Sequence, residues 1–200
     1  APKELVAALE AAVAGAPVST QLPRVLACSP FAADVCRRRP ELLLDLLAGG
    51  QLQASLPESA FHDDLRRQLA AADTEVGIVL RRYRQRHMLR IIWRDFCRLA
   101  DTRETVRDTS LLAEACIAEA LQVSQAALEA RFGVPRGRDS GRPQQLIVLA
   151  MGKLGAGELN VSSDIDLIFA FPEAGETDGA AGGQARSISN EEFFTRVGRA

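Results

Sequence analysis

The feature that most constrains the fold of this chain is a change in the spacing of its apolar residues after about residue 143. Before this point apolar residues recur every three or four positions, as in Leu89, Ile92, Phe96 and Leu99, which is typical of helices with one buried face. After it, two short apolar runs at 145–151 and 164–171 are typical of buried strands. The sequence therefore predicts an α+β chain whose helices come first.

Helix start and stop signals divide the first two thirds of the chain. Ser19 or Thr20 can cap a short helix, and Pro30 follows Ser29 at a favoured first helical position. A long helical stretch is predicted after Ser59, with a break at 73–77 left open, and the next helix is predicted to start at Asp108 or Thr109. The predicted helices cover residues 3–14, 20–27, 30–39, 41–48, 59–99 and 108–131.

These patterns predict a helical N-terminal region at 1–132, a linker at 133–143 and an α/β domain from 144 to 200. The linker is rich in Gly, Pro and charge and has little to bury. A polar loop at 172–186 follows the second strand, and Ser189 or Asn190 is expected to start a last helix. The chain lacks an initial Met and stops inside that helix, so we expect a fragment of a longer protein.

Composition restricts the kind of protein. The chain has 200 residues, 47% of them hydrophobic, and a net charge of -2, which argues against a general nucleic-acid or membrane binder. No run reaches the ~18 apolar residues that a membrane helix needs. The cysteines form no CxxC pair and are expected to be reduced, mostly buried thiols of a cytoplasmic protein: Cys28, Cys36, Cys97 and Cys116.

The most informative stretch is MGKLGAGELNVSSDIDLIF, residues 151–169. It does not fit a P-loop, because Lys153 is followed by Leu154 where Ser or Thr is needed. It does not fit a dinucleotide-binding loop either, because Asn160 stands where the third glycine is required. What remains is a strand, a glycine-rich loop and a second strand that carries an Asp-x-Asp pair.

Asp164 and Asp166 stand two residues apart, so on a strand their carboxylates point to the same face. Two such carboxylates repel each other unless a cation lies between them, and hard oxygen ligands favour Mg²⁺. The alternative is a loop cap and an idle surface strand residue. Flanking apolar residues argue against it, because a buried strand does not hold an unused charged pair. The arrangement points to phosphoryl or nucleotidyl transfer.

The stretch resembles the nucleotidyltransferase superfamily of polymerase β type, which implies a mixed sheet that is incomplete in this chain. The residues in register with its pattern are Gly152, Gly157, Ser163, Asp164 and Asp166. Lys153 departs from the Ser that most members carry. Within the superfamily the stretch is similar to the glutamine synthetase adenylyltransferase and adenylyl-removing family, as are 22–47, 89–101 and 110–121.

The form NVSSDIDLIF resembles the N-terminal, adenylyl-removing half of that family. The resemblance implies phosphorolysis of an adenylylated tyrosine of glutamine synthetase, with phosphate consumed and ADP released. It implies that Asp164 and Asp166 hold Mg²⁺, that Gly152, Lys153 and Gly157 contact phosphate, and that Ser163 orients the loop. A third carboxylate would lie beyond residue 200. Implied partners are glutamine synthetase, a PII-type nitrogen signalling protein, and ADP or ATP. Adenylyl addition from ATP and a non-catalytic nucleotide-binding regulatory module remain open.

Arginines recur every four residues at 82, 86, 90, 94 and 98, joined by Arg81 and Arg84. A solvated face paired with carboxylates such as Asp95 or Asp101 is the favoured interpretation, and contact with phosphate or the protein substrate is the alternative. His62 and His87 have no metal-ligand neighbour at a useful spacing and are expected to be structural. Trp93 and Tyr83 are expected to pack in the core.

Overall fold

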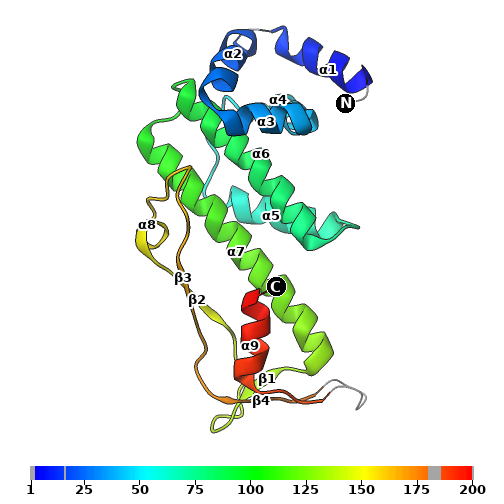
Figure 1. The fold of residues 1–200 in the computed structure, drawn as a ribbon, viewed down its shortest axis with the longest axis vertical. Helices are drawn as coiled ribbons and strands as arrows, with labels where there is room; N and C mark the ends of the chain where they lie inside the picture. Colours follow the sequence, from blue (N-terminus) through cyan, green and yellow to red (C-terminus); the bar gives the residue numbers. More distant parts are fainter. Residues whose placement is uncertain (1–2, 16, 180–185, 200) are drawn as a thin grey trace. The chain divides into compact units, whose positions relative to one another are not determined.

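The computed structural model describes residues 3–15, 17–179 and 186–199 (Figure 1). Its helices dominate the first part of the chain, and two small antiparallel sheets of two strands each lie in the last part. The α+β class is thus confirmed, although the described residues contain antiparallel pairs and not a mixed sheet. The chain forms two compact units: the first contains 1–116 and 157–163, and the second contains 117–156 and 164–200.

The first unit is helical. Its helices are α1 (Lys3–Val13), α2 (Val18–Cys28), α3 (Pro30–Arg38), α4 (Pro40–Ala48), α5 (Ala60–Ala71), α6 (Val76–Phe96) and the first part of α7 (Thr102–Phe132). The helices α2, α3 and α4 pack against α6 (Figure 1). The hydroxyl of Ser29 accepts the backbone N–H of Ala32 at 3.1 Å and so caps α3, where the sequence predicted a helix start.

Two predicted helix starts were wrong. Ser19 and Thr20 lie inside α2, which begins at Val18 without a side-chain cap. The last long helix, α7, begins at Thr102, ahead of Asp108, because the carboxylate of Asp101 accepts the N–H of Glu104 at 2.8 Å. The break left open within 59–99 is real, since α5 ends at Ala71 and α6 begins at Val76.

Aromatic residues of α6 pack in the two apolar cores of the first unit, as predicted. Trp93 is fully buried, and its indole N–H donates to the side chain of Gln21 at 2.9 Å. Tyr83 is buried beside the ring of His87, and its hydroxyl donates to the carbonyl of Phe61 at 2.7 Å. The four cysteines are free thiols, but Cys28 is exposed and the others are half-buried, so the prediction that most are buried was wrong.

The arginine row of α6 is not a solvated face throughout, and this part of the prediction was wrong. Arg90 is fully buried, and its guanidinium donates to the carbonyls of Gln51 and Ala54 and, at 2.8 Å, to Asp108. Arg94 is also buried; it donates to Glu104 and to the carbonyls of Leu52 and Leu99. Both guanidinium groups therefore hold the 51–54 loop and α7 and are occupied inside the protein.

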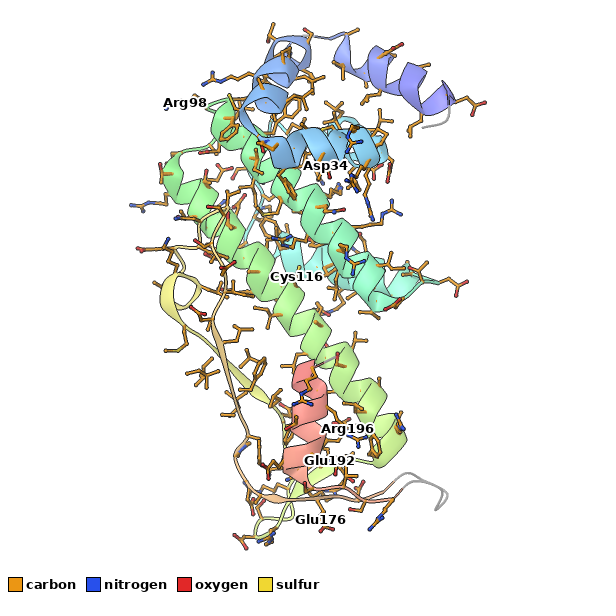
Figure 2. The ribbon with its side chains drawn as sticks, viewed as in Figure 1. Asp34, Arg98, Cys116, Glu176, Glu192 and Arg196 are labelled. Atoms are coloured by element: carbon orange, nitrogen blue, oxygen red, sulfur yellow. The ribbon has the colours of Figure 1, made fainter. Side chains whose placement is uncertain are left out.

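The second unit contains the last part of α7, the strands and two further helices. Its elements are β1 (Pro135–Gly137), β2 (Ile147–Ala150), α8 (Gly152–Gly155), β3 (Leu167–Ala170), β4 (Gly175–Thr177) and α9 (Asn190–Arg199). In the small core of this unit Phe132 and Leu146 pack with the apolar face of α9, which consists of Phe193, Phe194 and Val197. Glu192 and Arg196 form an ion pair one turn apart on α9 (Figure 2).

The stretch 133–143 contains β1, which pairs with β4, and the loop after β3 is more ordered than the sequence predicted. The carboxylate of Glu173 accepts the N–H groups of Asp139 and Ser140 and the Ser140 hydroxyl. These hydrogen bonds hold the pKa of Glu173 below its usual value, and the one from the Ser140 hydroxyl has the largest effect. The predicted polar loop at 172–186 thus contains β4, and its residues 180–185 lie outside the described residues. That residues 133–143 are a linker between two domains stays a prediction.

The strands β2 and β3 are much less buried than the sequence predicted. Ile147 and Leu149 on β2 are 44% and 48% exposed, and Ile168 and Phe169 on β3 are 49% and 48% exposed. The reason is that the two strands pair only with each other among the described residues, so neither has a neighbour on its outer edge. The apolar runs correctly predicted strands, but the prediction that these strands are buried was wrong.

Within the described residues, α7 is long and apolar enough to cross a membrane by length and composition. Its 31 residues contribute to apolar cores in both units. Leu112 and Ala115 belong to a core of the first unit, and Leu128 and Phe132 to the core of the second.

Candidate functional site

The candidate site lies at one end of the β2–β3 hairpin, where β2 leads into the glycine-rich loop. The strands pair antiparallel, with Ile147 opposite Ala170 and Ala150 opposite Leu167. The pairing continues one step further, because the N–H of Met151 donates to the carbonyl of Asp166 at 2.9 Å. Gly152 follows Met151 directly, so the start of the loop and Asp166 are neighbours.

Asp164 and Asp166 precede β3 and do not lie within it. The strand predicted at 164–171 is regular only over Leu167–Ala170, and both acids are exposed. The prediction that the two acids lie on a buried strand was wrong, so burial gives no reason to assign them a function. By the register, the side chain of Asp166 shares a face of the hairpin with Ile168 and Leu149.

Glycine is required in the loop for two different reasons. Gly152 and Gly157 have φ values of +56° and +69°, in the left-handed region that side chains with a Cβ rarely adopt. A Cβ at either position would meet nothing within 4 Å among the described residues. Gly155 is different, because its Cβ would collide with the backbone carbonyl of Ala150 at the end of β2.

Sequence reasoning did not select Gly155 as a site residue. It stands between the glycines of the superfamily pattern, and only the short helix α8 reveals its contact. The last turn of α8 is held by the N–H of Gly155, which donates to the carbonyl of Met151 at 3.2 Å. The glycine spacing GxxG within 152–155 is the local signal that could have indicated a tight turn.

Lys153 and Leu154 are neighbours on α8 that differ in exposure. Leu154 is only 2% exposed and fixes the helix to the protein, whereas Lys153 is exposed. Gly157 and Ser163 belong to the segment 157–163 of the first unit, where Ser163 donates its N–H to the carbonyl of Asn160 at 3.1 Å. The structure thus brings together Gly152, Lys153 and Asp166 within the second unit.

The two carboxylates suit a divalent cation by their chemistry. Both are exposed, and among the described residues no hydrogen bond or ion pair engages either side chain. Free carboxylate oxygens are the ligands that Mg²⁺ prefers, and Mg²⁺ keeps several waters when a site offers few protein oxygens. No cluster of three or more His, Cys, Asp or Glu side chains that could hold a metal occurs in the described part of the chain. Two carboxylates alone would leave most coordination positions of Mg²⁺ to water or to other ligands.

Comparisons with known proteins agree with the motif. Residues 19–200 match the family model described as glutamate-ammonia ligase adenylyltransferase. The bifunctional glutamine synthetase adenylyltransferase/adenylyl-removing enzyme of Nitrosococcus oceani is 48% identical over 177 residues, which is 88% of this chain. The enzymes of the same name from Pseudomonas aeruginosa and Pseudomonas putida are each 48% identical, over 88% and 90% of this chain.

The aligned region is 18% of the length of each of these relatives, so the chain spans less than a fifth of the proteins that it matches. The family model, in contrast, covers nearly all of the chain. Together with the strand, glycine loop and paired aspartates, this match establishes that the chain is a member of the glutamate-ammonia ligase adenylyltransferase family.

Proposed function

We propose that this chain carries the nucleotidyl-transfer site that removes AMP from adenylylated glutamine synthetase. The observation that carries the proposal is the Met151–Asp166 backbone hydrogen bond, which joins the start of the glycine loop to the second acid of the pair. This bond keeps a phosphate-binding turn and a metal-binding carboxylate at the same end of one hairpin. The names of the relatives support glutamine synthetase as the protein substrate.

In this reaction an oxygen of orthophosphate attacks the phosphorus of the AMP group. The bond between that phosphorus and the tyrosine oxygen breaks, a new phosphorus–oxygen bond forms, and the products are ADP and tyrosine, whose oxygen takes up a proton. Asp164 and Asp166 would hold Mg²⁺, which would offset the charge on the transferring phosphoryl group. No side chain of the protein needs to form a covalent bond, so the work of the site is positioning.

The loop residues have separate tasks in this proposal. The left-handed backbone at Gly152 and Gly157 leaves room for phosphate oxygens to approach backbone N–H groups. Lys153, exposed on α8 next to Gly152, would contribute a positive charge to those oxygens. Ser163, directly before Asp164, would orient the loop. A third carboxylate, which is not among the described residues, would complete the site. A PII-type signalling protein would bind the enzyme as a regulator. The enzyme would act in the cytoplasm.

The test is a phosphorolysis assay on the full-length protein with adenylylated glutamine synthetase, Mg²⁺ and labelled orthophosphate. We expect labelled ADP to form in proportion to AMP lost from glutamine synthetase, and Asp166→Asn to abolish it. Consumption of ATP with AMP added to glutamine synthetase by this site would instead favour the opposite reaction. Nucleotide binding without either reaction would favour a regulatory module.

A further inference from the structure

The segment 157–163 connects the glycine loop to Asp164, yet it packs on the helical unit. The backbone N–H of Leu159 donates to the hydroxyl of Ser110 on α7 at 3.0 Å. The Leu159 side chain is 4% exposed, and Val161 packs against both apolar cores of the first unit. The segment is therefore held by one buried hydrogen bond and two apolar side chains.

Ser110 is well suited to hold this segment. Its hydroxyl donates to the carbonyl of Val106 at 2.8 Å and accepts from Leu159, so both its donor and its acceptor are used. It is 3% exposed in the interior of a helix, where serine gives no advantage in helix stability. A buried hydroxyl at this position is explained by the N–H that it receives from outside the helix.

Covalent geometry carries this constraint to the aspartate pair. Asp164 is three positions after Val161, and an extended chain spans at most about 3.6 Å per residue, so the two Cα atoms are within about 11 Å. The turn closed by Ser163 N–H and the Asn160 carbonyl shortens that reach further. Any shift of the anchored segment on α7 therefore displaces the backbone that leads into Asp164.

We propose that Ser110 is a positioning residue for the nucleotidyl-transfer site: through Leu159 it fixes the segment that presents Asp164. This inference rests on the proposed function for its catalytic consequence, but the anchor itself does not. It assigns to the helical region a part in setting the geometry of the reaction. Loss of the anchor misplaces a carboxylate without removing it, so the rate falls while binding of the protein substrate is kept.

The chain provides a matched control in the preceding residue. Thr109 is 4% exposed, and its hydroxyl also donates four residues back, to the carbonyl of Thr105 at 2.7 Å. Among the described residues, no hydrogen bond joins Thr109 to the 157–163 segment. Ser110→Ala and Thr109→Val each remove one buried hydroxyl from α7, and only the first removes the partner of Leu159. Leu159→Ala weakens the same anchor from the loop side.

The experiment compares these variants in the full-length protein by hydrogen–deuterium exchange and by kinetics. We expect Ser110→Ala and Leu159→Ala to speed exchange in 157–163 about five- to tenfold, and Thr109→Val to leave it unchanged. We expect the phosphorolysis kcat of the first two to fall about ten- to a hundredfold, with KM for adenylylated glutamine synthetase unchanged.

Equal exchange in 157–163 for Ser110→Ala and Thr109→Val would overturn the anchor. Faster exchange with an unchanged kcat, or an equal loss of kcat in Thr109→Val, would overturn the positioning role. If the wild-type protein performs no phosphorolysis, the proposed function fails; the exchange comparison still decides the anchor, and the kinetic comparison is then made with whichever reaction the site performs. If the thermal midpoint falls in all three variants, the exchange rates and kcat of Ser110→Ala and Leu159→Ala are compared with those of Thr109→Val and not with those of the wild type.

Discussion

The backbone N–H of Met151 and the carbonyl of Asp166 form a hydrogen bond of 2.9 Å that extends the β2–β3 ladder beyond its regular strands. This bond uses main-chain atoms only, so it places Asp166 without engaging its carboxylate. The side chain at 166 can therefore change without breaking the ladder. That separation allows catalytic and structural effects to be measured independently.

For Asp164→Asn and Asp166→Asn we expect phosphorolysis to fall at least about a hundredfold, because each removes half of the charge that would hold the metal. The thermal midpoint should stay the same or rise slightly, since both acids are exposed and repel each other. Glu158→Gln removes an exposed acid from the same loop and should keep normal activity. A rate near that of the wild type in either aspartate variant would remove the pair from the mechanism.

For Lys153→Ala and Leu154→Ala, neighbours on α8, we expect opposite outcomes. The proposed contact of Lys153 with phosphate means that its loss should raise the KM for phosphate about tenfold. Because the side chain is exposed, stability should change little. The leucine is 2% exposed, and its truncation should cost about 2–5 kcal/mol of unfolding free energy. Phosphate titrations and urea unfolding of both variants check this. An unchanged KM for phosphate in Lys153→Ala would show that this lysine does not contact it.

Gly155→Ala tests the close approach of α8 to β2. The added methyl group meets the Ala150 carbonyl, which is backbone and cannot rotate away, so the end of β2 must move. We expect a lower urea midpoint and faster hydrogen exchange at 147–151. Gly152→Ala should cost about 1–2 kcal/mol from its left-handed backbone alone. Gly15→Ala, where a Cβ meets nothing within 4 Å among the described residues, is the control and should be neutral.

Arg90→Met should destabilise the first unit by about 3–5 kcal/mol, because it leaves Asp108 with only the ion pair to Arg107 and removes the donor to two backbone carbonyls. Arg82→Met, at a side chain that is 50% exposed, should change stability little. Replacing both partners, Arg90→Met with Asp108→Leu, should recover part of the loss, since no buried charge then lacks a partner. Urea unfolding of the single and double variants measures this coupling. Additive losses would contradict it.

Stability should fall below about pH 6.5 because of His87. Burial lowers the pKa of this imidazole, and Asp64, 3.7 Å from its Nε2, opposes the shift without overcoming it. Below pH 6.5 the unfolded chain gains a proton that the folded chain does not, so the free energy of unfolding drops by at most about 1.4 kcal/mol per pH unit. Chemical unfolding between pH 5 and 8 should show this slope in the wild type and in His62→Gln. The slope should be reduced in His87→Phe, and an unchanged slope there would exclude His87 as its source.

Local sequence signals predicted the elements whose causes are local. The cap at Ser29 and the start of α9 each depend on residues within one or two turns. The pairing of Pro135 with Thr177 joins residues about forty positions apart, and no local pattern reveals it. The same limit hid the burial of Arg90, whose partners include Gln51 and Asp108.

For the candidate site, the spacing of Gly152, Asp164 and Asp166 was sufficient to identify the chemistry to be tested. It did not reveal that the acids are exposed, because exposure depends on which strands are neighbours of β3. Nor did it reveal Gly155 or Ser110, whose contacts with Ala150 and Leu159 exist only in the folded chain.

The division of the chain into 1–116 with 157–163 and 117–156 with 164–200 has a consequence for biosynthesis. Residues leave the ribosome in order, so the first unit cannot complete its fold until residues 157–163 are made, and these follow residues 117–156 of the second unit. Neither unit can complete its fold before part of the other has been synthesised. Folding intermediates on the ribosome should therefore lack the 157–163 segment, and a nascent chain released before residue 157 would carry the helices with an uncovered hydroxyl at Ser110.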